Sequence, residues 1–109
     1  MKSYNWDTVP KEQLNPLLAR QVINTPQMTL MRLTFRKGAL VPTHQHVHEQ
    51  VSAVTSGALR FEMNGEEMTL RAGDVLVIPS SAPHLAEAME DTVSLDVFTP
   101  AREDLVRNG

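Results

Sequence analysis

Three of the four histidines in the chain lie at alternate positions of one short segment, residues 44–50, which reads His-Gln-His-Val-His-Glu-Gln. The fourth, His84, lies far downstream, directly after a proline. Neutral imidazole is the commonest protein ligand for metals, and nitrogen and oxygen ligands suit Ni, Zn, Fe, Mn or Co. The histidines therefore predict one divalent metal ion, held where two distant parts of the chain meet. The alternative is a histidine-rich strand that is exposed to solvent and binds no metal.

The position of Gln50 relative to the histidines decides whether it can bind the same ion. Alternate residues of a strand share one face, so the Cα atoms of His44 and His46 would lie about 7 Å apart. On a straight strand Gln50 would lie about 20 Å from His44, too far to share an ion. Either Gln50 is not a ligand, or the chain reverses near residues 47–49 and places Gln50 on the partner strand. We expect the reversal, because one unbroken strand would be too long for a domain of this size.

Length and composition limit the classes of protein to consider. The chain has 109 residues, enough for one domain with one modest core. Its net charge of -3 is small and its basic residues are scattered, so nothing favours nucleic acid. It has no cysteine, which excludes disulfides and thiolate metal sites. No apolar run is long enough to cross a bilayer or to form a secretory signal, so we expect a cytoplasmic protein.

Short β-rich segments separated by glycine, proline and asparagine cover nearly the whole chain, and helical periodicity is almost absent. Asn64-Gly65 is the strongest hairpin signal. This spacing predicts an all-β sandwich or small barrel over residues 17–109, after an irregular N-terminal arm over residues 1–16. One or two helical turns are expected in the tail, residues 99–109. The predicted strands are residues 17–23, 28–35, 39–47, 50–56, 58–63, 66–71, 75–78, 84–89 and 92–98.

A second group of chemically informative residues lies near the C-terminus. Asp96 and Phe98 share one strand face. Leu95 and Val97 face the other way, into apolar packing. A charged aspartate beside an aromatic ring is costly unless it meets water, a partner or a ligand. Arg102 carries a planar fork suited to a carboxylate, so the group is either an Asp96–Arg102 ion pair that holds the tail, or an acid or base with an apolar wall and a substrate clamp.

The histidine segment and its flanking glycines resemble the first sequence motif of the cupins. The matching residues are Gly38, His44, His46, Gln50 and Gly57, with Gln50 in the place where the family usually has glutamate.

The segment around His84 is similar to the second cupin motif. Gly73, Pro79 and His84 have the spacing of that motif, whereas Ser81 replaces its usual glycine and Ala88 its usual asparagine. The two motifs together are specific, and the resemblance extends over about residues 17–106.

The resemblance to the cupins implies a jelly-roll barrel, also called a double-stranded β-helix, with a short helical tail. It also implies that His44, His46, Gln50 and His84 bind the metal inside the barrel. His48 is left outside this ligand set, as a residue that supports a ligand or lines the barrel mouth.

The amide of Gln50 has a chemical consequence for such a metal site. Three neutral imidazoles and a neutral amide leave the full charge on a divalent ion, so the ion would be a stronger Lewis acid. Oxygen-activating iron more often has a carboxylate ligand. Gln50 therefore favours hydrolytic, isomerising or hydrating chemistry, unless it is a tolerated variation in a site that holds structural metal.

The histidine run and the Asp-x-Phe-x-Pro-x-Arg-x-Asp ending together resemble the small cupins of pectin and alginate degradation. Those proteins convert 4,5-unsaturated monouronates into linear ketonised sugars. The resemblance implies catalytic roles for Asp96 and Arg102, and substrate binding by Phe98 and Arg102. The alternatives are a metal-dependent oxygenase of the dioxygenase type and a cupin that binds a small molecule without catalysis.

The expected partners are a small-molecule substrate, a sugar acid, and a second copy of the chain. Tyr4 and Trp6 make the N-terminal arm apolar enough to dock on that second copy, which predicts a homodimer. The alternative is an arm that folds back on its own barrel.

Overall fold

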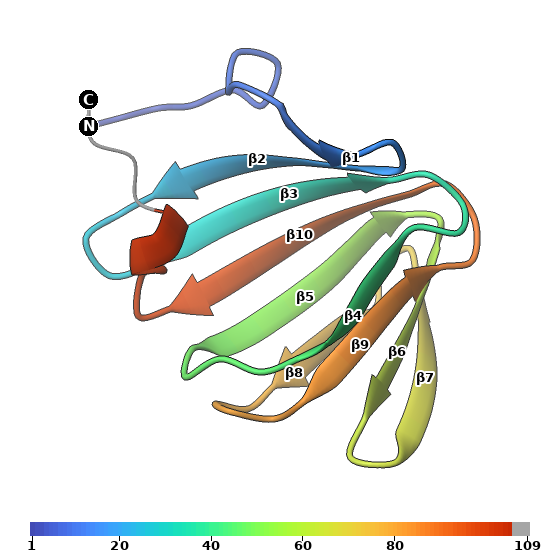
Figure 1. The fold of residues 1–109 in the computed structure, drawn as a ribbon. Helices are drawn as coiled ribbons and strands as arrows, with labels where there is room; N and C mark the ends of the chain where they lie inside the picture. Colours follow the sequence, from blue (N-terminus) through green and yellow to red (C-terminus); the bar gives the residue numbers. More distant parts are fainter. Residues whose placement is uncertain (106–109) are drawn as a thin grey trace.

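Residues 1–105 are described by the computed structural model, and they form short antiparallel strands with one short 3₁₀ helix near the end (Figure 1). The elements are β1 (Glu12–Asn15), β2 (Leu18–Asn24), β3 (Thr29–Phe35), β4 (Leu40–His44), β5 (Glu49–Ser56), β6 (Ala58–Met63), β7 (Glu66–Arg71), β8 (Val75–Ile78), β9 (His84–Ala88), β10 (Thr92–Thr99) and η1 (Glu103–Leu105).

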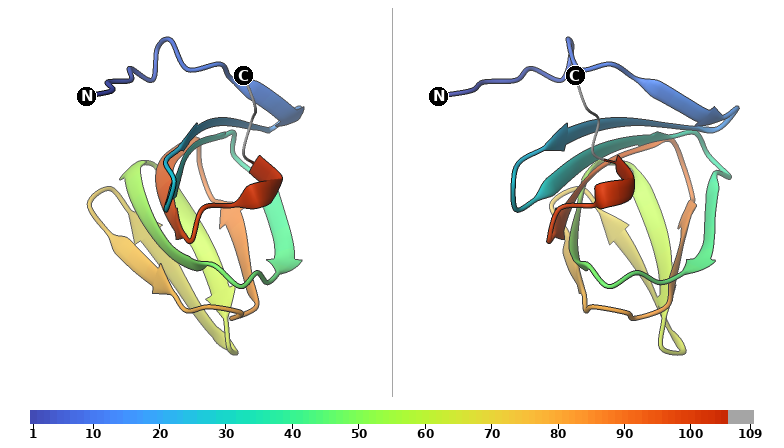
Figure 2. Two further views of the ribbon diagram at one scale, coloured as in Figure 1. Left: turned by 90° about the vertical axis from the view of Figure 1, so that its left-hand side faces the viewer. Right: turned by 60° about the vertical axis from the view of Figure 1, so that its left-hand side comes forward.

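The strands form two sheets that face each other across one core (Figure 2). The larger sheet has the order β1-β2-β3-β10-β5-β8, and the smaller has the order β4-β9-β6-β7. Consecutive strands such as β4 and β5 belong to different sheets, so the chain crosses repeatedly from one sheet to the other. The all-β prediction is confirmed.

Alternating burial along the strands explains how the core forms. In β3 every second residue is buried, and the inward side chains Met31, Leu33 and Phe35 belong to the main core cluster. Phe35 is only 2% exposed, and burying a side chain of this kind contributes about 1.5–3 kcal/mol.

Two turns depend on residues with positive φ. Asn64 and Gly65 have φ of 54° and 77° and join β6 to β7, as the hairpin signal predicts. Gly57 has φ of 91°, and a Cβ there would collide with the backbone of Asp91. Gly57 therefore lets the turn between β5 and β6 lie directly against the backbone of Asp91.

Several sequence predictions need correction. Part of the arm predicted as irregular forms the strand β1, which pairs with β2. The histidine strand β4 ends at His44 rather than at residue 47, because the chain leaves the smaller sheet there. Within the tail the structure describes η1, three residues long, whereas residues 106–109 lie outside the described part.

The predicted orientation of β10 is right for Asp96 and Phe98 but wrong for their neighbours. Asp96 and Phe98 share the buried, inward face. Leu95 and Val97 lie half-buried on the outer face and do not belong to the core cluster. The barrel interior carries polar groups at this position, so apolar residues on the same strand face outward.

Within residues 1–105 no helix has the length and apolar character that a membrane span requires.

Candidate metal centre and cavity

Three histidines converge at one end of the barrel. His44 ends β4 and His84 begins β9, and these two residues are directly opposite each other in the antiparallel register of the two strands. His46 lies in the connection from β4 to β5. One ring nitrogen from each of the three histidines lies within 4.8 Å of the others, a group that could hold a metal ion.

Backbone carbonyl groups orient all three rings. The Nδ1 atoms of His44, His46 and His84 lie 2.9, 3.0 and 2.8 Å from the carbonyl oxygens of Pro42, His48 and Ala82. A carbonyl oxygen can only accept, so each Nδ1 carries the proton and each Nε2 keeps its lone pair. This is how proteins orient histidines that bind metals.

Gln50 begins the inward face of β5 and completes the group. Its Oε1 lies 3.0 Å from His46 Nε2, and its Nε2 donates to Ser52 Oγ at 2.9 Å. The predicted change of direction between His46 and Gln50 is present, but β5 does not pair with β4. It pairs with β10 and β8 in the other sheet, so Gln50 approaches the histidines across the barrel.

These contacts fit a bound cation. The single ring proton of a neutral His46 lies on Nδ1, so Nε2 and the Gln50 Oε1 face each other with lone pairs on both atoms. The buried Nε2 of His84 has no hydrogen-bond partner among the described residues. A divalent ion between these atoms would bind the lone pairs that otherwise remain unused, and nitrogen and oxygen donors suit such an ion.

Burial keeps two of the histidines in the form that binds metal. Desolvation lowers the pKa of His46 and of His84 below the usual histidine value. The positive charge of Arg102 acts in the same direction on both rings. Neutral imidazole is therefore favoured at these two positions near neutral pH.

A cavity of about 180 Å³ lies beside the histidines, inside the barrel. Its walls are mostly apolar and come from both sheets. The polar and aromatic residues that line it at the metal end include His44, Gln50, His84, Asp96, Phe98 and Arg102. The structure thus brings most of the predicted site residues to one cavity.

Asp96 is a buried carboxyl group with a strongly changed acidity. Its side chain is 5% exposed, and desolvation raises its pKa to about 7. A hydrogen bond from Ser52 and the positive charge of Arg102 act in the opposite direction and limit the rise. Both protonation states are therefore available near neutral pH, as a general acid or base requires.

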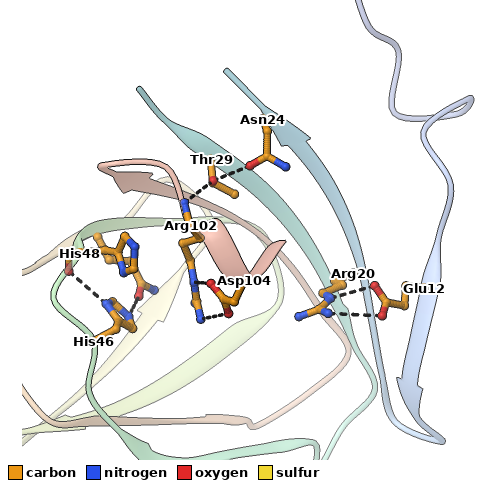
Figure 3. A network of polar contacts seen from close by, with 9 residues as sticks. Glu12, Arg20, Asn24, Thr29, His46, His48, Arg102 and Asp104 are labelled. Atoms are coloured by element: carbon orange, nitrogen blue, oxygen red, sulfur yellow. Dashed lines mark hydrogen bonds and ion pairs between the residues drawn. The ribbon is translucent and has the colours of Figure 1, made fainter. Parts of the chain in front are cut away.

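Phe98 and Arg102 form one side of the cavity. The centre of the Phe98 ring is 5.5 Å from that of the His46 ring, at an angle of 72°. The Arg102 guanidinium lies over the Phe98 ring, 4.9 Å from its centre. The backbone N–H of Arg102 donates to Thr29 Oγ1 at 2.8 Å (Figure 3). This bond attaches the start of the tail to β3 and holds the guanidinium near the metal end.

The partner of Arg102 differs from the interpretation as an Asp96–Arg102 ion pair. Arg102 pairs with Asp104 through Nε and Nη2, at 3.3 and 2.9 Å (Figure 3). Within the described residues no Asp96–Arg102 contact is close enough for an ion pair. The short helix η1 turns the tail back and brings Asp104 to the guanidinium.

His48 supports the site from outside the metal group. Its backbone oxygen orients the His46 ring, and its own ring centre lies 5.5 Å from that of His46. It does not belong to the group of three histidines that could hold an ion. This agrees with leaving His48 out of the ligand set.

Three residues of this region were given no role in the sequence analysis. Ser52 shares the inward face of β5 with Gln50, and its position two residues after Gln50 could have indicated this from the sequence. Arg20 has the inward parity of Leu18 on β2 and lines the cavity. Asp104 is the last residue of the C-terminal motif, but the motif did not show that it pairs with Arg102, because that contact depends on how η1 folds.

The chain belongs to the cupin family, since the profile of the family described as Cupin domain matches residues 31–99. This agrees with the jelly-roll arrangement of the two sheets, and the predictions of family and fold class are confirmed.

Solved structures give the same result. KdgF from Halomonas sp. is 31% identical with a TM-score of 0.91, and the match covers 96% of this chain and 100% of that chain. An RmlC-like cupin from Shewanella frigidimarina NCIMB 400 is also 31% identical, with a TM-score of 0.89 over 94% of each chain. AerE from Microcystis aeruginosa, 22% identical with a TM-score of 0.78 over 84% of this chain and 45% of that chain, shares the fold. A search of curated proteins found no match.

Proposed function

We propose that this cupin is a metal-dependent enzyme that converts 4,5-unsaturated monouronates into linear ketonised sugars. The observation that carries the proposal is that one cavity combines possible metal ligands, a carboxyl group that titrates near neutral pH, an aromatic wall and an arginine. The likeness to KdgF agrees with the resemblance to small cupins of pectin and alginate degradation.

The metal would be held by His44, His46 and His84 through ring nitrogens, and by Gln50 through its amide oxygen. When bound, a divalent ion supplies Lewis acidity that polarises a ring or hydroxyl oxygen of the substrate. The neutral amide of Gln50 leaves the ion with more positive charge than a glutamate would.

Arg102 would bind the carboxylate of the substrate. Its Nε and Nη2 atoms contact Asp104, while Nη1 donates to none of the described residues. The guanidinium can therefore donate to a substrate carboxylate while it keeps its contact with Asp104. Phe98 would shape the pocket and exclude water from the double bond.

Asp96 would move protons during hydration of the double bond and ring opening. Its pKa of about 7 gives both the acid and the base form near neutral pH. Water addition at C5 gives a hemiketal, and its opening gives the C5 ketone and a hydrated aldehyde at C1. Loss of that water leaves a linear keto-aldehyde that is an isomer of the cyclic enol ether, so the reaction needs no oxidant or reductant.

Elemental analysis of purified protein, followed by a screen of unsaturated uronates, tests the proposal against its alternatives. We expect about one divalent ion per chain and conversion of a uronate without oxygen consumption. Bound iron with substrate-dependent oxygen consumption would instead identify an oxygenase. Metal and uronate binding without any product would identify a non-catalytic binding protein. Arg102→Ala should lose uronate conversion. Its matched control is Arg60→Ala, which should retain conversion because Arg60 pairs with glutamates and does not line the cavity.

We also propose a homodimer in the cytoplasm, with the barrel domain beginning at residue 17. Part of the arm is held on its own sheet, because Gln21 Nε2 donates to the backbone oxygens of Trp6 and Val9 at 2.6 and 2.8 Å. Tyr4 remains 56% exposed and is the part of the arm available to a second copy. Light scattering on the wild-type protein and on Tyr4→Ser checks this, and a monomeric wild-type protein would contradict it.

A further inference from the structure

Ser52 connects the candidate metal ligand Gln50 to the candidate acid–base group Asp96. It is opposite Asp96 in the register of β5 and β10, and it is 0% exposed. Its hydroxyl accepts from Gln50 Nε2 at 2.9 Å and hydrogen-bonds the carboxyl group of Asp96. No water or substrate needs to enter for these contacts to form.

The number of protons on Ser52 determines the direction of these bonds. A serine hydroxyl has one proton to donate and lone pairs to accept. When Asp96 is ionised, its carboxylate only accepts, so the proton of Ser52 then points to Asp96. The lone pairs of Ser52 then face Gln50, and the amide must present its N–H group there.

This direction decides which end of the amide faces the histidines. With Nε2 bound to Ser52, Oε1 lies 3.0 Å from His46 Nε2. An amide turned by half a rotation would present N–H donors to the histidine group and could not bind a cation. A carboxylate at the same position has an oxygen at both ends, so its rotation changes nothing.

We infer that Ser52 is a positioning residue for the metal, and that it holds the Gln50 amide with its oxygen toward the three histidines. The inference rests on the proposed metal site. It assigns to Ser52 a role that is needed with glutamine at position 50 and would be dispensable with glutamate.

A double-mutant cycle tests this role through metal affinity rather than activity. Calorimetric titration of the metal-free protein with Ni²⁺ would compare wild type, Ser52→Ala, Gln50→Glu and the double variant. We expect Ser52→Ala to weaken Ni²⁺ binding about tenfold, the usual effect of removing a residue that orients a ligand. In the Gln50→Glu protein the same Ser52→Ala change should alter affinity by less than about twofold.

Ser94 supplies a matched control on the neighbouring strand β10. It is also an inward-facing serine with 0% exposure, but its Oγ has no hydrogen-bond partner among the described residues. Ser94→Ala removes the same atoms from the same barrel interior without touching Gln50. Its Ni²⁺ affinity should equal that of wild type, and the thermal melting of metal-free Ser52→Ala and Ser94→Ala shows whether both variants fold.

The outcomes separate this inference from the proposed function. A wild-type protein that binds Ni²⁺ while Ser52→Ala binds it equally well would overturn the inference alone. An equal loss of affinity in the glutamine and glutamate backgrounds would also overturn it, because amide orientation would then not be the cause. A folded wild-type protein that binds no divalent metal would contradict both the inference and the proposed metal site.

Discussion

The two faces of β5 and β10 have opposite character, and both differ from an ordinary sheet. On the inward face near the metal end, the side chains are polar and almost fully buried: Gln50, Ser52, Ser94 and Asp96. On the outward face of the same strands, the side chains are apolar and only half-buried: Val51, Ala53, Leu95 and Val97. A sheet that only stabilised the fold would place these two groups the other way round.

The inversion places costly polar groups on the inward face, beside the histidine group. Burying a polar group without a partner costs about 1–3 kcal/mol, and three buried side-chain atoms of the described residues have no partner, in His48, His84 and Ser94. The other part of the interior is conventionally apolar, with Phe35, Val54 and Leu59 each at most 2% exposed. The barrel thus combines a stabilising apolar part with a costly polar part.

The largest effect should come from removing a histidine of the polar part. His84→Ala takes away a buried ring nitrogen at the centre of the group, so metal affinity should fall by more than about a hundredfold, beyond the effect of removing a supporting residue. Titration with Ni²⁺ measures this. His48→Ala is the control and should retain metal, because His48 is outside the group of three. Equal losses in both variants would show that the ligand set is misassigned.

Replacing Asp96 with a side chain that does not ionise should remove a loss of folding stability that wild type shows as pH rises. The folded-state pKa of about 7 lies above the ordinary value of 3.8, so the folded protein binds more protons between these values. The contribution of Asp96 to stability is therefore greatest at low pH and falls as pH rises from about 4 to about 7. Asp96→Asn lacks this loss.

Urea unfolding of metal-free protein at several pH values checks this sign. Between pH 4 and pH 8 the free energy of unfolding of Asp96→Asn should rise relative to wild type, by on the order of a few kcal/mol. A constant difference across that range would mean that Asp96 has an ordinary acidity.

Two valines test the conventional part of the interior against the outward face. Val54 is 2% exposed on the inward face of β5, and Val77 is 57% exposed on the outward face of β8. Val54→Ala should lower the free energy of unfolding by about 2 kcal/mol, whereas Val77→Ala should change it by less than about 0.5 kcal/mol. Urea unfolding at one fixed protein concentration measures both. Similar values would contradict the assignment of the two faces.

A smaller effect is expected from changing the charge of the metal group. Gln50→Glu should retain metal, because a carboxylate oxygen replaces the amide oxygen, but it should lower turnover of an unsaturated uronate about tenfold, since the ion becomes a weaker Lewis acid. Metal content and turnover are measured on the same sample. Unchanged turnover would remove the argument from Lewis acidity.

The sequence predicted the strands well because alternation and turn residues are local signals. Asn64-Gly65 and the run from Thr92 show this. It also indicated the convergence of His84 with His44, through motif spacing. It did not show that β4 ends at His44, or that β5 approaches from the opposite sheet, because strand pairing is a long-range property.

The roles of polar residues were harder to predict than the strands. The sequence placed Asp96 and Phe98 on one face but assigned Arg102 either to Asp96 or to a substrate. Asp104 takes that place because η1 turns the tail back toward the guanidinium. Ser52 was missed because an inward serine looks like ordinary core filling until its hydrogen bonds are known.

One measurement tests the central claim most directly: NMR of unsaturated galacturonate mixed with wild-type protein and with Asp96→Ala, both carrying the same amount of metal. The account predicts that wild type removes the vinyl proton signal and produces the linear ketone. It predicts that Asp96→Ala reduces this rate by at least about a hundredfold, the usual contribution of a general acid or base. Equal rates in the two proteins, or an unchanged substrate with metal-loaded wild type, would contradict it.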